Sequence, residues 1–187
     1  RTFPPRSDAA TIDSLPAPLA RATLLARLGM RVEARCELEA YGAQAAGSTD
    51  RMLTVAEGLA HGNWHARALR VAQRSLERGA AFDRRAAELL YPLPFSDLLR
   101  HEAAGAGVDP MLIAGLIRQE SLFDPEARSV ADARGLMQVL PSVGEELARK
   151  ASLPEWDAVL LYQPDVNLDF GIDHLAEGLR RLGWAER

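Results

Sequence analysis

The sequence has little of several features that would assign a protein class directly. It contains one cysteine, Cys36, which excludes an internal disulfide, and we expect this side chain to pack as a small apolar residue. No run approaches the ~20 apolar residues of a membrane span, and no signal peptide is visible at Arg1. The 22 basic and 26 acidic residues are interspersed, with a net charge of -4, so there is no basic footprint for nucleic acid. What is left is a chain of 187 residues, long enough to bury a core.

Motifs for metals and cofactors are also missing. His61 and His65 stand four residues apart, but Gly62 and Asn63 lie between them and no glutamate accompanies them as in a zinc-protease helix. We therefore predict no metal site and no cofactor.

The first half of the chain is a succession of helical patterns separated by glycine or polar breaks. The apolar spacing predicts helices over residues 17–28, 31–45, about 50–60, 64–79 and 83–91. Ser48 and Thr49 are suited to cap the third of these helices. Paired helices with short turns indicate stacked α-hairpins of the solenoid kind, although no exact repeat supports a named repeat family. Residues 1–16 are richer in Pro, Ser and Asp, which is typical of an extended arm.

One helix of this region carries a row of arginines. Arg67, Arg70, Arg74 and Arg78 recur at helical spacing and alternate with an apolar face. This pattern predicts a solvated face, with a groove for a partner as the alternative.

The second half of the chain places a glutamate on the apolar stripe of a helix. Asp109 and Pro110 are the residue types that begin a helix. Glu120 falls on the same side of the 3.6-residue period as Leu112, Ile113, Leu116 and Ile117. Partial burial and the negative end of the helix dipole would both favour the protonated carboxyl, and such an acid can protonate a leaving oxygen. The alternative is a solvated glutamate at a helix end.

The next segment predicts a loop that returns to an apolar run. A residue before proline is biased out of the α region, so Pro125 marks the end of the helix. Gly135 permits a positive φ or a close backbone approach, and the apolar run after it contains one amide, Gln138. A glutamine in such a place is either satisfied by backbone groups or offered to a ligand.

These segments carry a family resemblance. The run IRQES, Ser129 nine residues after the glutamate, and ARGLMQVLPS together resemble the catalytic segment of the soluble lytic murein transglycosylase family, whose fold is related to goose-type lysozyme. The likeness extends over about residues 89–183, and the first half loosely resembles the superhelix that precedes this domain. It implies an all-α protein with an arm over residues 1–16, a helical-hairpin superhelical region over 17–91 and a lysozyme-like α catalytic domain over 92–187.

The resemblance also implies roles for single positions. Glu120 matches the catalytic acid/base, and Ser121 the serine that follows it. Ser129 matches a serine of the substrate cleft, and Gln138 a glutamine along the sugar-binding groove. The other site residues implied by the likeness are Gly135, Met137 and Leu140, the last two as apolar groove surface.

Two loop positions depart from the family pattern. Val130 stands where proline is frequent and Asp132 where glycine is frequent. Asp132 is the milder change, because aspartate tolerates a left-handed backbone better than most residues.

The chemistry that the family implies needs a single carboxylate. Glu120 would protonate the oxygen between N-acetylmuramic acid and N-acetylglucosamine, and then deprotonate the C6 hydroxyl of the same muramoyl residue to close a 1,6-anhydro ring without water. An intramolecular hydroxyl can replace water because its effective molarity is high. Asp124, Glu126 and Asp132 are expected to serve turns or face solvent. The alternatives are a lysozyme-type hydrolase on the same fold and a non-catalytic helical scaffold of the cell envelope.

The implied substrate and compartment follow from the family. The expected partners are peptidoglycan glycan strands, with envelope proteins as further partners of the helical region, and the expected location is the bacterial envelope, periplasmic or exported.

The family continues past the helix ending near Gly183 into an Ala-Tyr-Asn-Ala-Gly motif. This chain stops at Arg187, so we expect a domain truncated at its C-terminus, with a natural protein that lacks part of the cleft as the alternative. Tyr162 lies in a different sequence context and is not given the role of that tyrosine.

Overall fold

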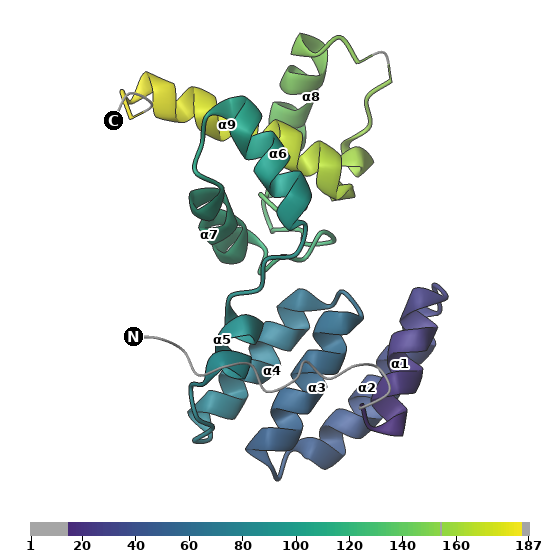
Figure 1. Cartoon of the computed structure of the whole chain (residues 1–187). Helices are drawn as coiled ribbons and strands as arrows, with labels where there is room; N and C mark the ends of the chain where they lie inside the picture. Colours follow the sequence, from purple (N-terminus) through teal and green to yellow (C-terminus); the bar gives the residue numbers. More distant parts are fainter. Residues whose placement is uncertain (1–14, 154, 185–187) are drawn as a thin grey trace. The chain divides into compact units, whose positions relative to one another are not determined.

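The computed structural model describes residues 15–153 and 155–184. Over these residues the chain is all-α, as predicted, and its β-structure is limited to two isolated bridges in one loop. The chain divides into two compact units, the first ending at Pro92 and the second beginning at Leu93 (Figure 1). No helix in the described part is long and apolar enough to cross a membrane. The arm expected over residues 1–16 lies outside the described residues except for its last two positions.

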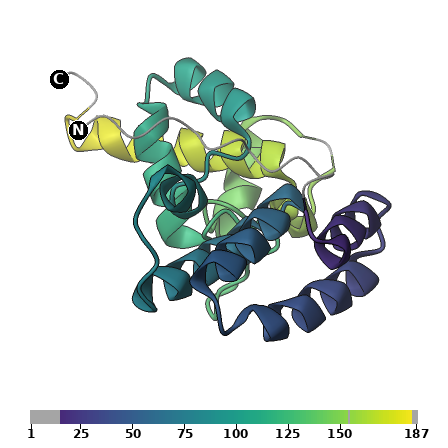
Figure 2. The same cartoon turned by 60° about the horizontal axis from the view of Figure 1, so that its bottom comes forward.

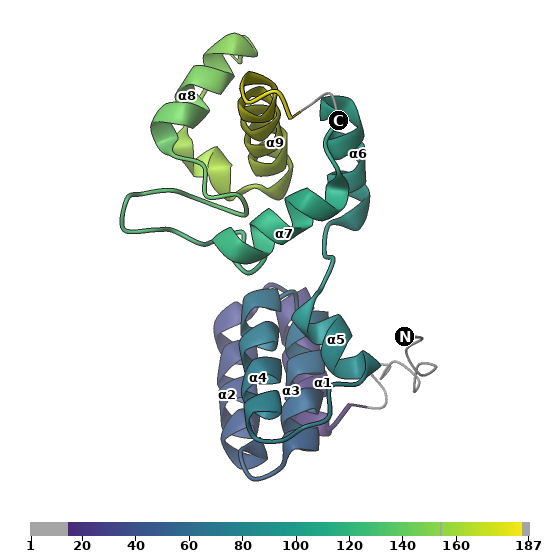
Figure 3. The same cartoon turned by 90° about the vertical axis from the view of Figure 1, so that its left-hand side faces the viewer.

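The N-terminal unit consists of helical hairpins. Its helices are α1 (Ala17–Arg27), α2 (Arg31–Ala45), α3 (Thr49–His61), α4 (His65–Glu77) and α5 (Arg84–Leu90). They agree with the five predicted helices. The first hairpin joins α1 to α2 and the second joins α3 to α4, and these helices stand side by side in Figure 3. Fully buried alanines and leucines, such as Ala22, Ala56 and Leu69, let the helices approach closely.

Short polar side chains fix the helix ends of this unit. The Ser48 hydroxyl accepts a hydrogen bond from the backbone N–H of Arg51, which confirms the predicted cap of α3. Asp83 caps α5 by accepting from the N–H of Ala86 at 2.9 Å. Both side chains satisfy a backbone donor that has no partner within the helix.

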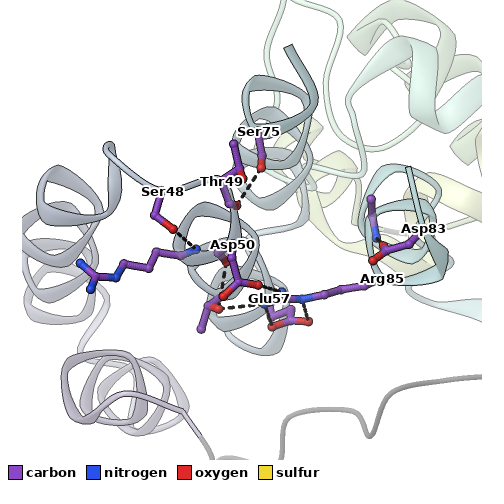
Figure 4. A network of polar contacts seen from close by, with 10 residues as sticks. Ser48, Thr49, Asp50, Glu57, Ser75, Asp83 and Arg85 are labelled. Carbon is purple, nitrogen blue, oxygen red and sulfur yellow. Dashed lines mark hydrogen bonds and ion pairs between the residues drawn. The ribbon is translucent and has the colours of Figure 1, made fainter. Parts of the chain in front are cut away.

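One arginine connects α5 to α3 (Figure 4). Arg85 donates from Nε and one terminal nitrogen to the two carboxylate oxygens of Glu57, at 2.6 and 2.8 Å. It also donates to Asp50 at 2.6 Å and to the Thr54 hydroxyl at 2.8 Å. The Arg85 and Glu57 side chains are only 22% and 18% exposed, so this forked pair is shielded from solvent and fixes the short α5 on the hairpin.

Cys36 corrects one expectation. It lies on the outer face of α2 and is exposed, so it does not pack as an apolar residue. The side of α2 that faces the unit carries Ala34, Leu38 and Ala45, and Cys36 falls two residues from that line.

The C-terminal unit gathers its helices around α9. It contains α6 (Ser96–Ala106), α7 (Pro110–Glu120), α8 (Pro141–Lys150), the 3-10 helix η2 (Ala158–Tyr162) and α9 (Pro164–Arg181). Helix α9 runs across the unit in Figure 2. It packs on α6 and η2, and α6 packs on α7. The largest fully buried side chains of the unit include Ile117, Phe123 and Leu136, which bring the end of α7 and the loop after it into the core.

Candidate active site

Helix α7 positions Glu120 at its last residue. The Asp109 carboxylate caps the helix by accepting from the N–H of Met111 at 2.8 Å, and Pro110 occupies the first turn, as predicted. The buried side of the helix consists of Ile113, Ala114 and Ile117.

Glu120 itself lies at the edge of the buried stripe. It is exposed, and Leu112 on the same edge is 50% exposed. The expectation that Glu120 packs among aliphatic neighbours is therefore wrong. The reason is the position of Glu120 around the helix axis. Residues 112, 116 and 120 form one row along the helix, whereas the core covers the adjacent row of Ile113 and Ile117.

Ser121 joins the end of α7 to the loop that follows. Its hydroxyl lies 2.8 Å from the carbonyl oxygen of Leu136 and donates a hydrogen bond to it, with the Ile117 carbonyl at 3.1 Å as a second acceptor. The Ser121 side chain is buried. In this structure the hydroxyl is directed to backbone carbonyls rather than to open surface, and it fixes the residue next to Glu120 against residue 136.

The chain turns sharply immediately after Ser121. Leu122 and Phe123 have φ values of 54° and 63°, a left-handed conformation that non-glycine residues rarely adopt. Phe123 is nevertheless buried, at 2% exposure. The burial of this ring stabilises a strained turn directly next to Glu120.

The loop between α7 and α8, whose course is visible in Figure 3, is held by hydrogen bonds within its own backbone. Arg134 and Val139 exchange two N–H···O=C bonds, at 2.9 and 3.0 Å. The N–H of Gly135 donates to the carbonyl of Ala127 at 2.9 Å. These bonds close the loop into a defined shape although it contains no strand or helix.

Asn167 of α9 is the main side-chain anchor of this loop, and the sequence analysis did not single it out. It is fully buried. Its amide oxygen accepts from the N–H of Met137 at 2.8 Å, and its amide nitrogen donates to the carbonyls of Arg134 and Leu161, at 2.9 and 2.8 Å. The local signal was weak, because its partners are backbone groups as far as 33 positions away.

Two glycines allow the loop to approach α9 and η2. Gly135 has a φ of 75°, and a Cβ there would overlap the Leu161 carbonyl oxygen and the Asn167 amide. Gly171 on α9 leaves space for Met137, whose Sδ would lie 2.5 Å from an added Cβ. Gly135 thus combines both properties predicted for it, the positive φ and the close approach. Met137 is only 8% exposed, so its side chain lies in the core rather than at the apolar groove surface that we expected.

Gln138 and Leu140 lie on either side of a buried valine. The Gln138 amide nitrogen donates to the carbonyls of Gly135 and Ala127, at 2.9 and 3.2 Å. The sequence left two alternatives for Gln138, a partner in the backbone or a ligand. For the amide nitrogen the structure shows backbone partners. The amide oxygen of Gln138 has no hydrogen-bond donor among the described residues. Leu140 is 40% exposed and offers apolar surface.

Ser129 and Asp132 shape the tip of the loop. The Ser129 hydroxyl accepts from the N–H of Ala133 at 3.0 Å. Asp132 has a φ of 65°, the left-handed conformation considered for it. Its carboxylate pairs with Arg134 and Arg128, which hold the pKa of this carboxyl below its usual range through hydrogen bonds, that from Arg134 contributing most.

The acidic residues of this segment differ in whether their carboxylates already have partners in the structure. Asp124 accepts from the N–H of Glu126 at 3.0 Å in a turn, as expected, and Glu126 is exposed. Asp132 is engaged by arginines. The Glu120 side chain makes no hydrogen bond or ion pair with another described residue, and Glu120 is the last residue of a helix anchored at both ends. It is the carboxylate of this segment that is held in place and left available.

Two cavities lie elsewhere. One of about 460 Å³ is in the N-terminal unit, and one of about 300 Å³ lies against α8 and α9; neither is lined by Glu120. Across the described residues no group of three or more His, Cys, Asp or Glu side chains is arranged to hold a metal ion.

Comparison with known proteins gives similarities in both sequence and fold. The family model "Transglycosylase SLT domain" matches residues 97–186. The membrane-bound lytic murein transglycosylase C of Actinobacillus pleuropneumoniae is 43% identical over 81 residues, which are 42% of this chain and 22% of that protein. An inactive mutant of the lytic transglycosylase Slt from Pseudomonas aeruginosa superimposes with a TM-score of 0.71 at 27% identity, covering 90% of this chain and 26% of that one. The 70-kDa soluble lytic transglycosylase of Escherichia coli gives 0.72 at 20% identity, covering 98% of this chain and 28% of that one.

These relatives are lytic transglycosylases, and the solved structures among them share the all-α fold described above. The family model covers nearly all of the C-terminal unit, so this unit is similar to transglycosylase SLT domains. The chain spans between a fifth and a third of the length of these relatives.

Proposed function

We propose that the chain is part of a lytic transglycosylase that cleaves the β-1,4 bond between N-acetylmuramic acid and N-acetylglucosamine in peptidoglycan. The observation that carries the proposal is Glu120, an available carboxylate at the end of an anchored helix, inside the SLT match. The neighbouring carboxylates support it indirectly, because Asp124 and Asp132 are used in the loop and leave one candidate for acid and base work.

In the proposed reaction Glu120 acts twice. The protonated carboxyl gives its proton to the bridging oxygen, and that carbon–oxygen bond breaks. The carboxylate then takes the proton of the C6 hydroxyl of the same muramoyl residue, whose oxygen attacks C1 and closes a 1,6-anhydro ring. The proton returns to Glu120, so no water is consumed. A second carboxylate, which ordinary glycoside hydrolases use, is not required.

The other site residues have supporting roles in this proposal. Leu140 and the Gln138 amide oxygen line the sugar-binding groove, with Ser129 at the tip of the loop. Ser121, Gly135 and Met137 hold the loop in its shape. The proposed domain boundaries are 17–91 for the helical-hairpin region and 92–187 for the catalytic domain, and the proposed location is the periplasmic or exported side of a bacterial envelope.

The test is the mass of the products released from purified sacculi by the natural gene product. We expect 1,6-anhydromuropeptides, and we expect Glu120→Gln to reduce their release by at least about a thousandfold, because the group that transfers both protons is lost. Glu145→Gln, which changes an exposed carboxylate of α8, should release as much as wild type.

Two results would reject the proposal. Products heavier by one water would identify a lysozyme-type hydrolase on the same fold. Undiminished release by Glu120→Gln would remove Glu120 from the reaction.

A further inference from the structure

A groove in the N-terminal unit lies apart from the candidate active site. It has a volume of about 460 Å³ and is lined by residues of α2, α3 and α4. The apolar residues among them include Leu38, Ala45, Met52, Val55, Leu59 and Val71. A concave surface of this size accommodates a short peptide segment rather than a folded domain.

One wall of this groove is a row of four arginines from α4 and its C-cap. They are Arg67, Arg70, Arg74 and Arg78. Arg67 lies 3.8 Å from Glu39 of α2, and Arg78 donates to a backbone carbonyl at 2.6 Å. Arg70 and Arg74 are exposed and form no ion pair with another described residue. The middle of the wall therefore presents two guanidinium groups above an apolar floor.

The charge of the groove runs against that of the chain. The whole sequence has a net charge of -4, whereas the polar wall here is cationic. Guanidinium groups bind carboxylates with two parallel hydrogen bonds, and the apolar floor favours aliphatic side chains. We propose that this groove binds an amphipathic acidic peptide segment of a partner protein, with its apolar side chains on the floor and its carboxylates on Arg70 and Arg74. This inference does not depend on the reaction proposed for Glu120.

Gly42 provides a way to close the groove without disturbing the fold. It lies within α2 and lines the groove, and a Cβ added there meets no atom within 4 Å. Gly42→Leu would place an aliphatic side chain in the groove, and leucine favours a helix more than glycine does. The substitution therefore removes the binding space while the helix is retained.

The experiment measures fluorescence anisotropy with three labelled peptides that share one apolar helical face and carry Glu, Gln or Lys along the polar edge. We expect the Glu peptide to bind at least about tenfold more tightly than the Gln peptide, and the Lys peptide not to bind. Gly42→Leu and the pair Arg70→Ala with Arg74→Ala should each weaken the Glu peptide by about tenfold or more.

A matched control removes two other arginines. Arg51 and Arg149 are exposed and lie outside the groove, so Arg51→Ala with Arg149→Ala should leave the affinity within about twofold. Equal binding of the Glu and Lys peptides, or an equal loss in the control pair, overturns the proposal. So does self-association of the chain through the groove in sedimentation experiments, if Gly42→Leu abolishes it. Glu120→Gln should bind the Glu peptide as wild type does, which separates this test from that of the proposed reaction.

Discussion

At Gly135 three parts of the C-terminal unit meet. The loop, η2 and α9 approach so closely that a single methyl group at this position would overlap the Leu161 carbonyl and the Asn167 amide. The left-handed backbone at this residue adds a second reason for glycine, because any other side chain is strained there.

We expect Gly135→Ala to lower the free energy of unfolding by about 2–4 kcal/mol, from steric overlap and backbone strain together. Gly105→Ala is the matched control. Gly105 lies within α6 and an added Cβ meets nothing within 4 Å, so its substitution should stabilise by up to about 1 kcal/mol. Urea unfolding of both variants checks the pair, and a similar effect of the two substitutions would contradict this account.

Asn167 gives a second prediction at this scale. Truncation to alanine removes the Asn167 partner of the Met137 N–H and of the Leu161 carbonyl, and it removes one of the two donors to the Arg134 carbonyl. We therefore expect Asn167→Ala to cost about 3 kcal/mol of stability. His174→Ala, an exposed change on the same helix, should cost less than about 0.5 kcal/mol. Chemical denaturation followed by circular dichroism measures both. Equal midpoints for the two variants would show that Asn167 is not the anchor.

The contrast between Asp109 and Asn167 shows what the sequence predicts well. The cap formed by Asp109 involves an N–H two residues away, so residue type and order are sufficient to predict it. Asn167 acts on backbone groups that come close only after α9 has packed, and a single buried amide looks the same in sequence as an exposed one. Glu120 is an intermediate case: its helix was predicted, but its exposure depends on which of two adjacent rows the core covers.

At the scale of elements, a hydrogen bond from the Ser121 hydroxyl connects the end of α7 to the loop that follows it. The Ser121 bond to the Leu136 carbonyl connects two segments 15 positions apart in the sequence. Helix α7 ends at Glu120, before the Pro125 that was expected to mark its end, because Ser121 already leaves the helical conformation. The helix ends of the N-terminal unit were predictable, because glycine and capping residues mark them locally. The shape of the loop was not, since its turns depend on Leu122, Phe123 and Gln138 in left-handed conformations that their residue types do not favour.

We expect Ser121→Ala to reduce kcat about tenfold with KM nearly unchanged, because the substitution displaces the end of α7 rather than a group that binds the glycan. The loss of stability should be only about 1 kcal/mol. Steady-state assays on defined glycan-strand fragments, together with urea unfolding, separate the two effects. A rise in KM at constant kcat would instead place Ser121 in substrate binding.

At the scale of the whole molecule, one histidine links stability to pH. His65 begins α4, and its Nδ1 is buried without a hydrogen-bond partner in the described structure. Burial lowers its pKa below the ordinary value of 6.5. The folded chain therefore binds this proton less readily than the unfolded chain. The stability contributed by neutral His65 is fully present above about pH 6.5 and is lost as the pH falls through the lower folded-state pKa.

We expect the free energy of unfolding of wild type to fall more steeply than that of His65→Gln between about pH 7.5 and about pH 5.5. His101→Gln should keep the wild-type slope, because His101 is exposed. Urea unfolding across this range is the measurement. Parallel curves for wild type and His65→Gln would contradict the assignment.

The side chains that anchor the α7–α8 loop determine which other positions of the loop can be substituted. Ser121, Asn167 and the Gln138 amide nitrogen all bind main-chain atoms, and every amino acid supplies the same carbonyl and, proline apart, the same N–H. Side chains along the loop can therefore be exchanged while its course is kept. Substitutions at positions such as Val130, which is fully exposed at the tip, should therefore leave the geometry next to Glu120 unchanged.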